Sequence, residues 1–432
     1  MTARPRALLV LVHQGLSYLP EIVDCMASIG IQIVALSSYA DRSKPFFSQT
    51  RTLSDWRLSD LADLNDDEVQ KYLDSMEPHY HVIGAISTFE GYRILMARAN
   101  VRLATPDISE PLLLDCLDKL IMRKRLREAG LSSAHSFQLD ETRLAELQQS
   151  KIPYFIKPRC GVGSFGCLRL TPSITWSVIN SLRQQLLSDT FLRVACLDHF
   201  DFIAESFIEG TECSFEIVAC DGNFYPLAIH EKLGLEERDQ TILENVDVSP
   251  AINLSSKQMQ QGADYIIRCL RELELNEGAF HVEARFDSAN SQWDIIEINP
   301  RIGGGLINTS VAATTASFSI LDAWLFILTR NHHQQEFLPQ LVDSSQRYDT
   351  PKYSTIGHYV FGYPGKRLKR VERCAGFPEP LKINQAAHDG DLLPSLSREI
   401  PVIEAIWRIP PTDLESYLQL LNTGWVNVEY VH

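Results

Sequence analysis

Residues 280–305 read FHVEARFDSANSQWDIIEINPRIGGG and carry the most informative pattern in the chain. Apolar and polar residues alternate across 279–286 and again across 293–298, which predicts two β-strands. The polar residues 287–292 between them predict a short turn. If the strands pair through this turn, polar side chains on one face of each strand would meet across a buried sheet.

Two carboxylates and one amide fall on these faces. Glu283 comes from the first strand, and Glu297 and Asn299 come from the second. Mg²⁺ prefers oxygen ligands and keeps some coordination positions for substrate phosphates, so the pattern is typical of a magnesium site. The alternative is that both glutamates form buried salt bridges with Arg285 and Arg301, and the two strands alone do not decide between these readings.

A glycine-rich segment lies upstream, between strands predicted at 154–157 and 168–170. The first strand ends in Lys157, and the small residues that follow are Gly161, Gly163, Ser164 and Gly166. Glycines let backbone N–H groups turn toward one anion, and a lysine adds a point charge, so the segment predicts a flap over phosphates. It is not a Walker A loop, which ends in GK[ST] before a helix. An ordinary glycine-rich hairpin turn is the alternative.

A third segment, IAESFIEGTECSFE at 203–216, joins strands predicted at 202–205 and 213–220 through a tight link at Gly210. A link between two lobes can offer backbone groups to the edge of a base and a carboxylate to ribose hydroxyls. A solvated acidic loop would look the same in the sequence.

The remaining periodicity predicts an α/β protein. Apolar segments at 7–12 and 31–36 flank a helical pattern at 19–29, which is typical of a parallel β-α-β opening. Further strands are predicted at 81–87, 101–104 and 224–230. Further helices are predicted at 118–130, with Asp118 as its N-cap, and at 258–273, 317–330 and 411–421.

Two other segments bear on organisation and function. The polar residues 332–353 predict a linker or a mobile segment. The turn after the first strand reads HQGLS at 13–17 and lacks the GxGxxG fingerprint, which argues against a dinucleotide site and hence against an NAD-dependent oxidoreductase.

Composition excludes several classes of protein. The chain has 432 residues, of which 45% are hydrophobic, and predicts about two to four domains. Its formal charge of −15 argues against a nucleic-acid partner. Nine cysteines without a CxxC pair indicate reduced thiols. The first apolar segment is too short for a signal peptide, and none approaches the roughly 20 residues of a membrane span, so we expect a cytoplasmic protein with no membrane partner.

The order of the motifs resembles the ATP-grasp superfamily over about residues 110–330. The motifs are DKxxMRxxLxxxG, IKPxxGxGSxG, ESFIEGxExSFE, HVExRxD and IIEINPRIGGG. Within the superfamily the chain looks most similar to L-amino-acid ligases and dapdiamide-synthetase-type enzymes. This resemblance implies an α/β fold with α+β lobes: an open parallel-sheet domain at 1–110, a two-lobed ATP-grasp domain at 111–330 with a hinge near 205–210, and a linker and C-terminal lobe at 331–432.

The resemblance also implies roles for individual residues. Those expected to bind ATP are Lys119 and Lys157 at the phosphates, Gly161, Gly163, Ser164 and Gly166 in the flap, Glu205, Ser206, Phe207 and Ile208 at the adenine, and Glu212 at the ribose. The expected magnesium ligands are Glu283, Glu297 and Asn299, and the expected catalytic residues are Arg301 and Lys157. Two departures are the lack of adjacent glycines in the flap and Ser206 in place of a usual acid or lysine.

Candidate substrate residues are His230, His281, Arg285, Gly304 and Gly305, together with the segment 232–250. The acids of this segment could bind an α-ammonium group or could form a solvated loop.

The function implied by the resemblance is ATP-dependent formation of an amide bond between a small carboxylate and an amino acid, through an acyl phosphate, with release of ADP and phosphate. The expected cofactors are ATP and two Mg²⁺ ions, with Mn²⁺ as a substitute. An ATP-grasp carboxylase, a purine-pathway-type ligase and a non-catalytic nucleotide-binding subunit are alternatives. The two substrates stay unidentified, and a homodimer stays open.

Overall fold

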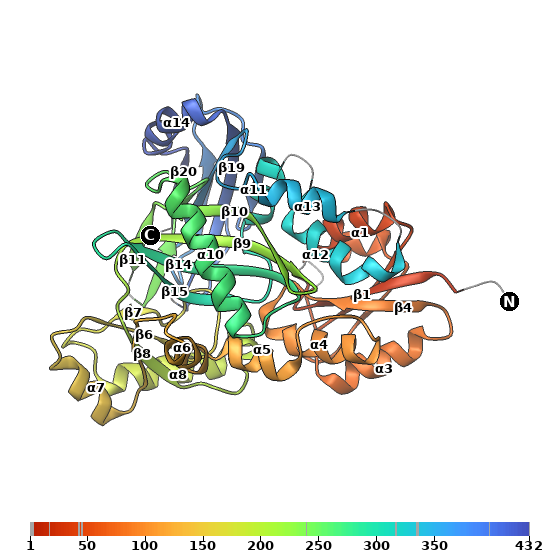
Figure 1. The fold of residues 1–432 in the computed structure, drawn as a ribbon, viewed down its shortest axis with the longest axis horizontal. Coiled ribbons are helices and arrows are strands. Elements are labelled where there is room, and N and C mark those ends of the chain that lie inside the picture. Colours follow the sequence, from red (N-terminus) through yellow and green to blue (C-terminus); the bar gives the residue numbers. More distant parts are fainter. Residues whose placement is uncertain are drawn as a thin grey trace.

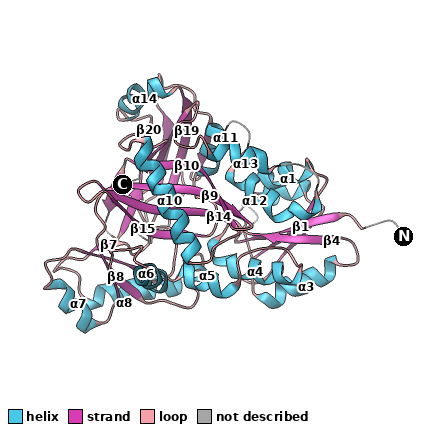
Figure 2. Cartoon of the chain, viewed as in Figure 1, coloured by secondary structure: helices cyan, strands magenta, loops and turns pink. Residues whose placement is uncertain are grey.

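The computed structural model describes residues 4–431, except 17, 42, 43, 45, 239, 316, 317, 334–336 and 397. It is a mixed α/β protein with a parallel sheet near the N-terminus and a large antiparallel sheet in the middle (Figures 1 and 2). In Figure 1 the first four strands lie at one end of the molecule, and the small sheet around β6 to β8 lies at the other. The fold class predicted from the sequence is confirmed.

The N-terminal sheet contains β1 (Arg6–Val12), β2 (Gln32–Ser37), β3 (Asp55–Leu58) and β4 (His81–Ile86), in the order β3-β2-β1-β4. β1 pairs with β2 and β4 in parallel, and α1 (Leu19–Ala27) connects β1 to β2, so the β-α-β opening is confirmed. Helix α3 (Asp66–Met76) packs with this sheet.

The strand predicted at 101–104 is wrong. Residues 101 and 102 end helix α4 (Arg93–Arg102), and residues 103 and 104 form a turn. The helical spacing of the apolar residues upstream extends into this short segment, so the segment continues the helix. Val101 is 76% exposed, whereas a residue of a buried strand would be covered.

The small lobe is a four-stranded sheet in the order β5-β8-β6-β7. Its strands are β5 (Ser136–Gln138), β6 (Tyr154–Pro158), β7 (Leu168–Arg169) and β8 (Phe202–Ser206). Helices α7 (Glu141–Gln148) and α8 (Trp176–Ser188) contribute leucines to its core. Helices α5 (Glu110–Leu117) and α6 (Lys119–Glu128) precede it, and the predicted cap is confirmed, since the Asp118 carboxylate accepts hydrogen bonds from the first turn of α6.

The large sheet has the order β15-β14-β9-β10-β13-β16-β19-β18. Its strands are β9 (Thr211–Cys220), β10 (Asn223–Lys232), β13 (Val246–Ser249), β14 (Gly278–Asp287), β15 (Gln292–Asn299), β16 (Ser354–Phe361), β18 (Lys382–Gln385) and β19 (Pro401–Ile409). Helix α10 (Ser256–Glu272) packs its apolar face against β9 and β14. The predicted hairpin of β14 and β15 is confirmed, and a separate hairpin of β11 (Leu235–Arg238) and β12 (Thr241–Glu244) projects from the sheet.

Three helices follow β15: α11 (Ile307–Thr315), α12 (Ile320–Thr329) and α13 (Leu338–Ser345). The helix predicted at 317–330 is α12, and its predicted first residue lies outside the described residues. The described part of residues 332–353, predicted as a linker or a mobile segment, contains α13 and buries Leu341 and Tyr348 in two hydrophobic cores.

The C-terminal strands β17 (Leu368–Arg373) and β20 (Val426–Tyr430) form a separate ribbon, and the predicted helix at 411–421 is confirmed as a 3₁₀ turn followed by α14 (Leu414–Leu421). The domain boundaries at 110 and 330 stay predictions, although the large sheet continues across residue 330. Among the described residues no single helix is long and apolar enough to cross a membrane. One pair, Ile307–Thr315 with Ile320–His332, has the length and composition only when taken together across an 86° bend.

Candidate active site

A cavity of about 860 Å³ lies where the small lobe, the large sheet and the C-terminal strands meet. Its walls include the flap residues 161–165, the hinge residues 205–208, the polar face of the β14–β15 hairpin and residues 391–394 and 398–401. A second cavity, of about 820 Å³, lies beside the hinge and is lined by none of the predicted lysines or magnesium ligands. The chemistry predicted from the sequence therefore converges on the first cavity.

Both predicted phosphate-binding lysines line this cavity. The Lys119 ammonium donates a hydrogen bond to the carbonyl of Gly161 at 3.1 Å and lies 3.3 Å from the carboxylate of Glu297. The Lys157 ammonium lies 2.6 Å from the carboxylate of Glu205 and donates to the carbonyl of Ile296 at 3.2 Å. An ammonium group has three N–H bonds, so each lysine has one left for a ligand.

Glu283 and Glu297 face each other because they are paired in the register of β14 and β15. Burial raises the pKa of Glu283, and the neighbouring charge of Glu297 adds to this rise. Although burial opposes ionisation, the charges of Lys119 and Lys157 lower the pKa of Glu297 to about 2. Asn299 donates its side-chain N–H to Glu297 at 3.1 Å, which fixes the orientation of the amide. Its amide oxygen is an acceptor and is therefore suited to a cation.

These three oxygen donors fit Mg²⁺. Two half-buried carboxylates in register repel each other, and a divalent cation between them would relieve that repulsion.

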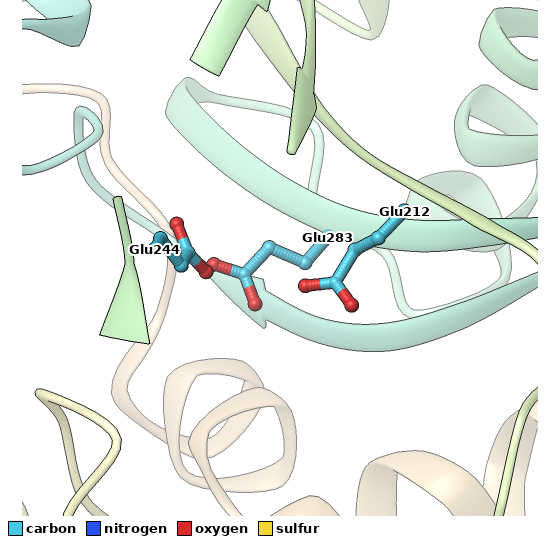
Figure 3. Close-up of side chains that lie close together, drawn as sticks. All are labelled: Glu212, Glu244 and Glu283. Carbon is cyan, nitrogen blue, oxygen red and sulfur yellow. The ribbon is translucent and has the colours of Figure 1, made fainter. Parts of the chain in front are cut away.

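Figure 3 shows a further acidic cluster, formed by Glu212, Glu244 and Glu283. One carboxylate oxygen from each residue lies within 4.8 Å of the other two. Glu212 forms an ion pair with Arg285 at 2.6 Å, and Glu244 forms one with Lys232. Glu283 is the member that this cluster shares with the predicted magnesium ligands, because it is also paired with Glu297 in the register of β14 and β15.

His281 lines the cavity and holds Glu283 in place. Its Nδ1 lies 2.7 Å from the carboxylate of Glu216, and its Nε2 lies 3.2 Å from the carboxylate of Glu283. Although burial opposes the charged ring, these two carboxylates raise the pKa of His281 to about 10. His230 is fully buried, pairs with Ser310 at 2.8 Å and is not among the residues that line the cavity. The structure therefore places His281, and not His230, within reach of a ligand.

Arg285 lies at the hinge and not at the end of the cavity near Arg301. It donates to the carbonyl of Ile208 at 2.6 Å, and its guanidinium lies 4.7 Å from the centre of the Phe207 ring. Its ion pair with Glu212 brings that acid to the same end of the cavity, as the ribose prediction requires. Burial raises the pKa of Glu212 to about 7 against the lowering effect of Arg285.

The polar side chains at the start of the hinge are already engaged. The Glu205 carboxylate pairs with Arg123 and Lys157, and the Ser206 hydroxyl accepts a hydrogen bond from the backbone of His135. Gly210 is required at the tight link, since its φ is +116° and a Cβ there would lie 2.1 Å from the carbonyl oxygen of Phe286. The hinge therefore offers its backbone and the Phe207 ring to a ligand.

The flap between β6 and β7 contacts the β11–β12 hairpin. Gly166 donates its backbone N–H to the carbonyl of Gln240 at 2.9 Å, and the Thr241 hydroxyl donates to the carbonyl of Ser164 at 3.1 Å. Gly163 and Ser164 adopt left-handed backbone conformations, with φ values of +70° and +52°.

Arg301 lies just after β15 and is paired with a residue that sequence reasoning missed. Its Nε lies 3.2 Å from the carboxylate of Glu90, which belongs to a short 3₁₀ turn, Glu90–Tyr92, of the N-terminal region. Burial raises the pKa of Glu90, and the charge of Arg301 opposes this rise. Gly304 and Gly305 line the cavity beside Arg301, as predicted for substrate residues.

Lys232 and Glu244 were part of the predicted specificity segment, but their ion pair was not anticipated. The predicted strand ended at residue 230 and left Lys232 in the following segment, whereas β10 extends through Lys232, and no local signal identified its partner. Glu90 carried no sequence signal, because its turn is short and its partner lies in another part of the chain.

Residues 150–310 match the family model of the ATP-grasp domain. Among solved structures, an L-amino acid ligase from Bacillus licheniformis is similar over 100% of both chains, with a TM-score of 0.75 and 18% identity. Phosphoribosylglycinamide synthetase from Anaerococcus prevotii has a TM-score of 0.64 and 14% identity, over 99% of this chain and 100% of the other.

The biotin carboxylase domain of 2-oxoglutarate carboxylase from Hydrogenobacter thermophilus, solved with MgADP and bicarbonate, has a TM-score of 0.68 and 14% identity, over 100% of this chain and 92% of the other. At these identities the three structures establish a shared fold and leave the substrates open.

Proposed function

From the presence of an ATP-grasp domain at residues 150–310, we propose that this protein is an ATP-dependent carbon–nitrogen ligase that joins a carboxylate to the amine of an amino acid. The observation that carries the proposal is the convergence of Lys119, Lys157, Glu283, Glu297 and Arg301 on one cavity. The set combines cations for phosphates, oxygen ligands for a metal and a cation for a developing oxyanion.

In the proposed mechanism the backbone of the hinge residues 206–208 and the ring of Phe207 hold the adenine, and Glu212 accepts hydrogen bonds from the ribose. Lys119, Lys157 and the flap N–H groups bind the phosphates. Glu283, Glu297 and Asn299 would hold Mg²⁺, with two ions expected and Mn²⁺ as a substitute, and the metal when bound supplies charge that neutralises the phosphates.

The first chemical step is attack of the substrate carboxylate on the γ-phosphate, which gives ADP and an acyl phosphate. Negative charge grows on the transferred phosphoryl group, and the lysine ammonium groups are fixed in the cavity before it develops. Preorganised charges of this kind stabilise the transition state without reorganisation during the reaction.

The second step is attack of the amine on the acyl carbon, with loss of phosphate. The tetrahedral intermediate carries an oxyanion, and Arg301 is the cation placed to stabilise it. Glu90 fixes the Arg301 guanidinium from the N-terminal side of the cavity. Cys167, which lines the cavity, is not needed as a nucleophile, because the activated species is the acyl phosphate.

An ATP-grasp carboxylase is the second candidate, because the chain also resembles a biotin carboxylase domain solved with bicarbonate. Such an enzyme would use the same ATP site with bicarbonate as the acceptor. The higher TM-score of the L-amino acid ligase, 0.75 against 0.68 for the carboxylase domain, supports an amino acid as the amine substrate.

One experiment separates the two candidates. Purified protein is incubated with MgATP and a matrix of amino-acid pairs, or with bicarbonate, while ADP release is recorded and products are weighed by mass spectrometry. The proposal expects ADP release that requires amino acids, with a product equal to the sum of two amino acids minus water. ADP release with bicarbonate and none with any amino-acid pair would contradict it.

A further inference from the structure

Lys157 belongs to a buried group of four charged side chains at the junction of the two lobes. The group comprises Lys157 on β6, Glu205 on β8, Arg123 on α6 and Asp294 on β15. β6 and β8 belong to the small lobe, whereas β15 belongs to the large sheet. The four side chains therefore connect a phosphate-binding residue to both lobes.

Arg123 is fully buried and occupies the middle of this group. Its Nε donates to Glu205 at 2.7 Å, and one Nη donates to Asp294 at 2.9 Å. The other Nη donates to the backbone carbonyl of Ile295. A planar guanidinium with this many fixed acceptors has one orientation, so Arg123 holds Glu205 rigidly.

Asp294 is fixed from the opposite side. Its carboxylate accepts hydrogen bonds from the Ser132 hydroxyl at 2.7 Å and from the backbone and hydroxyl of Ser133 at 2.8 and 2.9 Å. The negative charge that balances Arg123 is thus held by donors outside the cavity that contains Lys157. Asp294 instead lines the second cavity, beside the hinge.

Both oxygens of Glu205 are in use. Oε1 accepts from Arg123, and Oε2 lies 2.6 Å from the Lys157 ammonium. Only 4% of Glu205 is exposed. The carboxylate is thus enclosed and held by two cations, which leaves little of it accessible to the exocyclic amine of adenine, although its position before the hinge had predicted an adenine contact.

The Lys157 ammonium uses its second N–H on the carbonyl of Ile296, the residue before Glu297. Its third N–H is left for the cavity that Lys157 lines. A lysine has four rotatable side-chain bonds, and fixing them before the ligand arrives lowers the entropy lost on binding. The same contact sets the distance between the phosphate-binding ammonium and the metal-binding carboxylate of Glu297.

We propose that Glu205 and Arg123 are positioning residues, which fix the Lys157 ammonium for the phosphates of ATP and make no contact with adenine. The proposal rests on the proposed function only in that this cavity binds ATP. It assigns the Glu205 carboxylate to the phosphate end of the nucleotide through Lys157.

The test compares the dissociation constants of ATP and adenosine, because adenosine has the base and ribose but no phosphates. In the Glu205→Gln variant we expect ATP affinity to fall about tenfold or more, as for loss of a charge-assisted contact, while adenosine affinity stays unchanged. The matched control is Glu209→Gln, an exposed acid in the same hinge segment, which should leave both constants unchanged. An equal loss of affinity for ATP and adenosine in Glu205→Gln would overturn the proposal, and so would an unchanged affinity for ATP.

Removal of a buried ionised partner can also destabilise the fold. Arg123→Lys keeps the charge but loses the planar fork, so it provides a second variant. Arg123→Lys should lower the affinity for ATP and leave the affinity for adenosine unchanged. In a Lys157→Gln background, neither Glu205→Gln nor Arg123→Lys should lower the affinity for ATP any further. Additive losses in these double variants would contradict action through Lys157. If wild-type protein bound ATP no more tightly than adenosine, both the proposed function and this proposal would be overturned.

Discussion

The guanidinium of Arg301 lies 3.2 Å from the carboxylate of Glu90, and this ion pair joins the end of the β14–β15 hairpin to the N-terminal region. Only 4% of Glu90 is exposed. The ATP-grasp domain therefore does not complete the site by itself. The N-terminal region supplies the side chain that sets the direction of the cation proposed to face the acyl phosphate.

Replacing Glu90 by Gln should lower kcat about tenfold or more and leave the dissociation constant of ATP unchanged. The reason is that Arg301 loses the charged partner that orients it, whereas Lys119 and Lys157, which are proposed to bind the phosphates, keep theirs. Steady-state kinetics and ATP titration check this. Glu110→Gln, which removes an exposed ion pair with Arg98 in the same region, is the matched control. Full turnover of the Glu90 variant would refute the orienting role.

Arg301→Ala should affect reaction of the acyl phosphate more than ATP binding. Without its cation the tetrahedral oxyanion is unsupported, and a loss of roughly a hundredfold in kcat is typical for removal of one such group. Rapid-quench measurements of acyl phosphate formation and amide formation check which step slows. A severe loss of ATP affinity with normal turnover would show that Arg301 belongs to the nucleotide site.

Glu297→Gln should abolish ligation while the protein stays folded. A neutral amide cannot replace a carboxylate that balances a divalent cation and also pairs with Lys119. ADP release and thermal unfolding, measured with and without MgATP, check this together. Glu146→Gln, on α7, serves as the control because it removes only an exposed ion pair with Arg143. Wild-type turnover in Glu297→Gln would rule out the magnesium assignment.

The flap should become more protected from hydrogen exchange when nucleotide binds. Its glycines make an unliganded loop costly to order, and phosphate contacts to its N–H groups would offset that cost. The hydrogen bonds of the flap with Gln240 and Thr241 extend the expectation to the β11–β12 hairpin. Exchange across residues 158–168 and 235–244, with and without a non-hydrolysable ATP analogue, tests this. Equal exchange in both states at saturating nucleotide would mean that the phosphates are held elsewhere.

Local patterns predicted the parts of the fold that depend on local chemistry. The alternation in 279–298 identified the hairpin that places Glu283 opposite Glu297, and the apolar segments near the N-terminus identified the parallel opening. The same reasoning failed at 101–104, where the end of a helix looks like a short strand. At 332–353 a mostly polar composition concealed α13 and the buried Leu341 and Tyr348.

The site residues that could not be predicted depend on contacts between distant segments. The position of Glu205 before the hinge predicted an adenine contact, and its ion pair with Arg123 could not be predicted because Arg123 comes from a helix that precedes the small lobe. Arg285 was expected at the substrate, but the register of β9 and β14 pairs it with Glu212 at the hinge. Register and lobe packing are set by the whole fold, so no local pattern carries them.

Isotope labelling tests directly whether an acyl phosphate forms, because it follows oxygen atoms from the carboxylate to phosphate. The amino acid that acts as acyl donor is labelled with ¹⁸O in its carboxylate, ligation is run with MgATP, and the phosphate released is analysed by mass spectrometry. If an acyl phosphate forms, one labelled oxygen appears in each phosphate and the nucleotide product is unlabelled ADP. Unlabelled phosphate, or AMP carrying the label, would contradict the account.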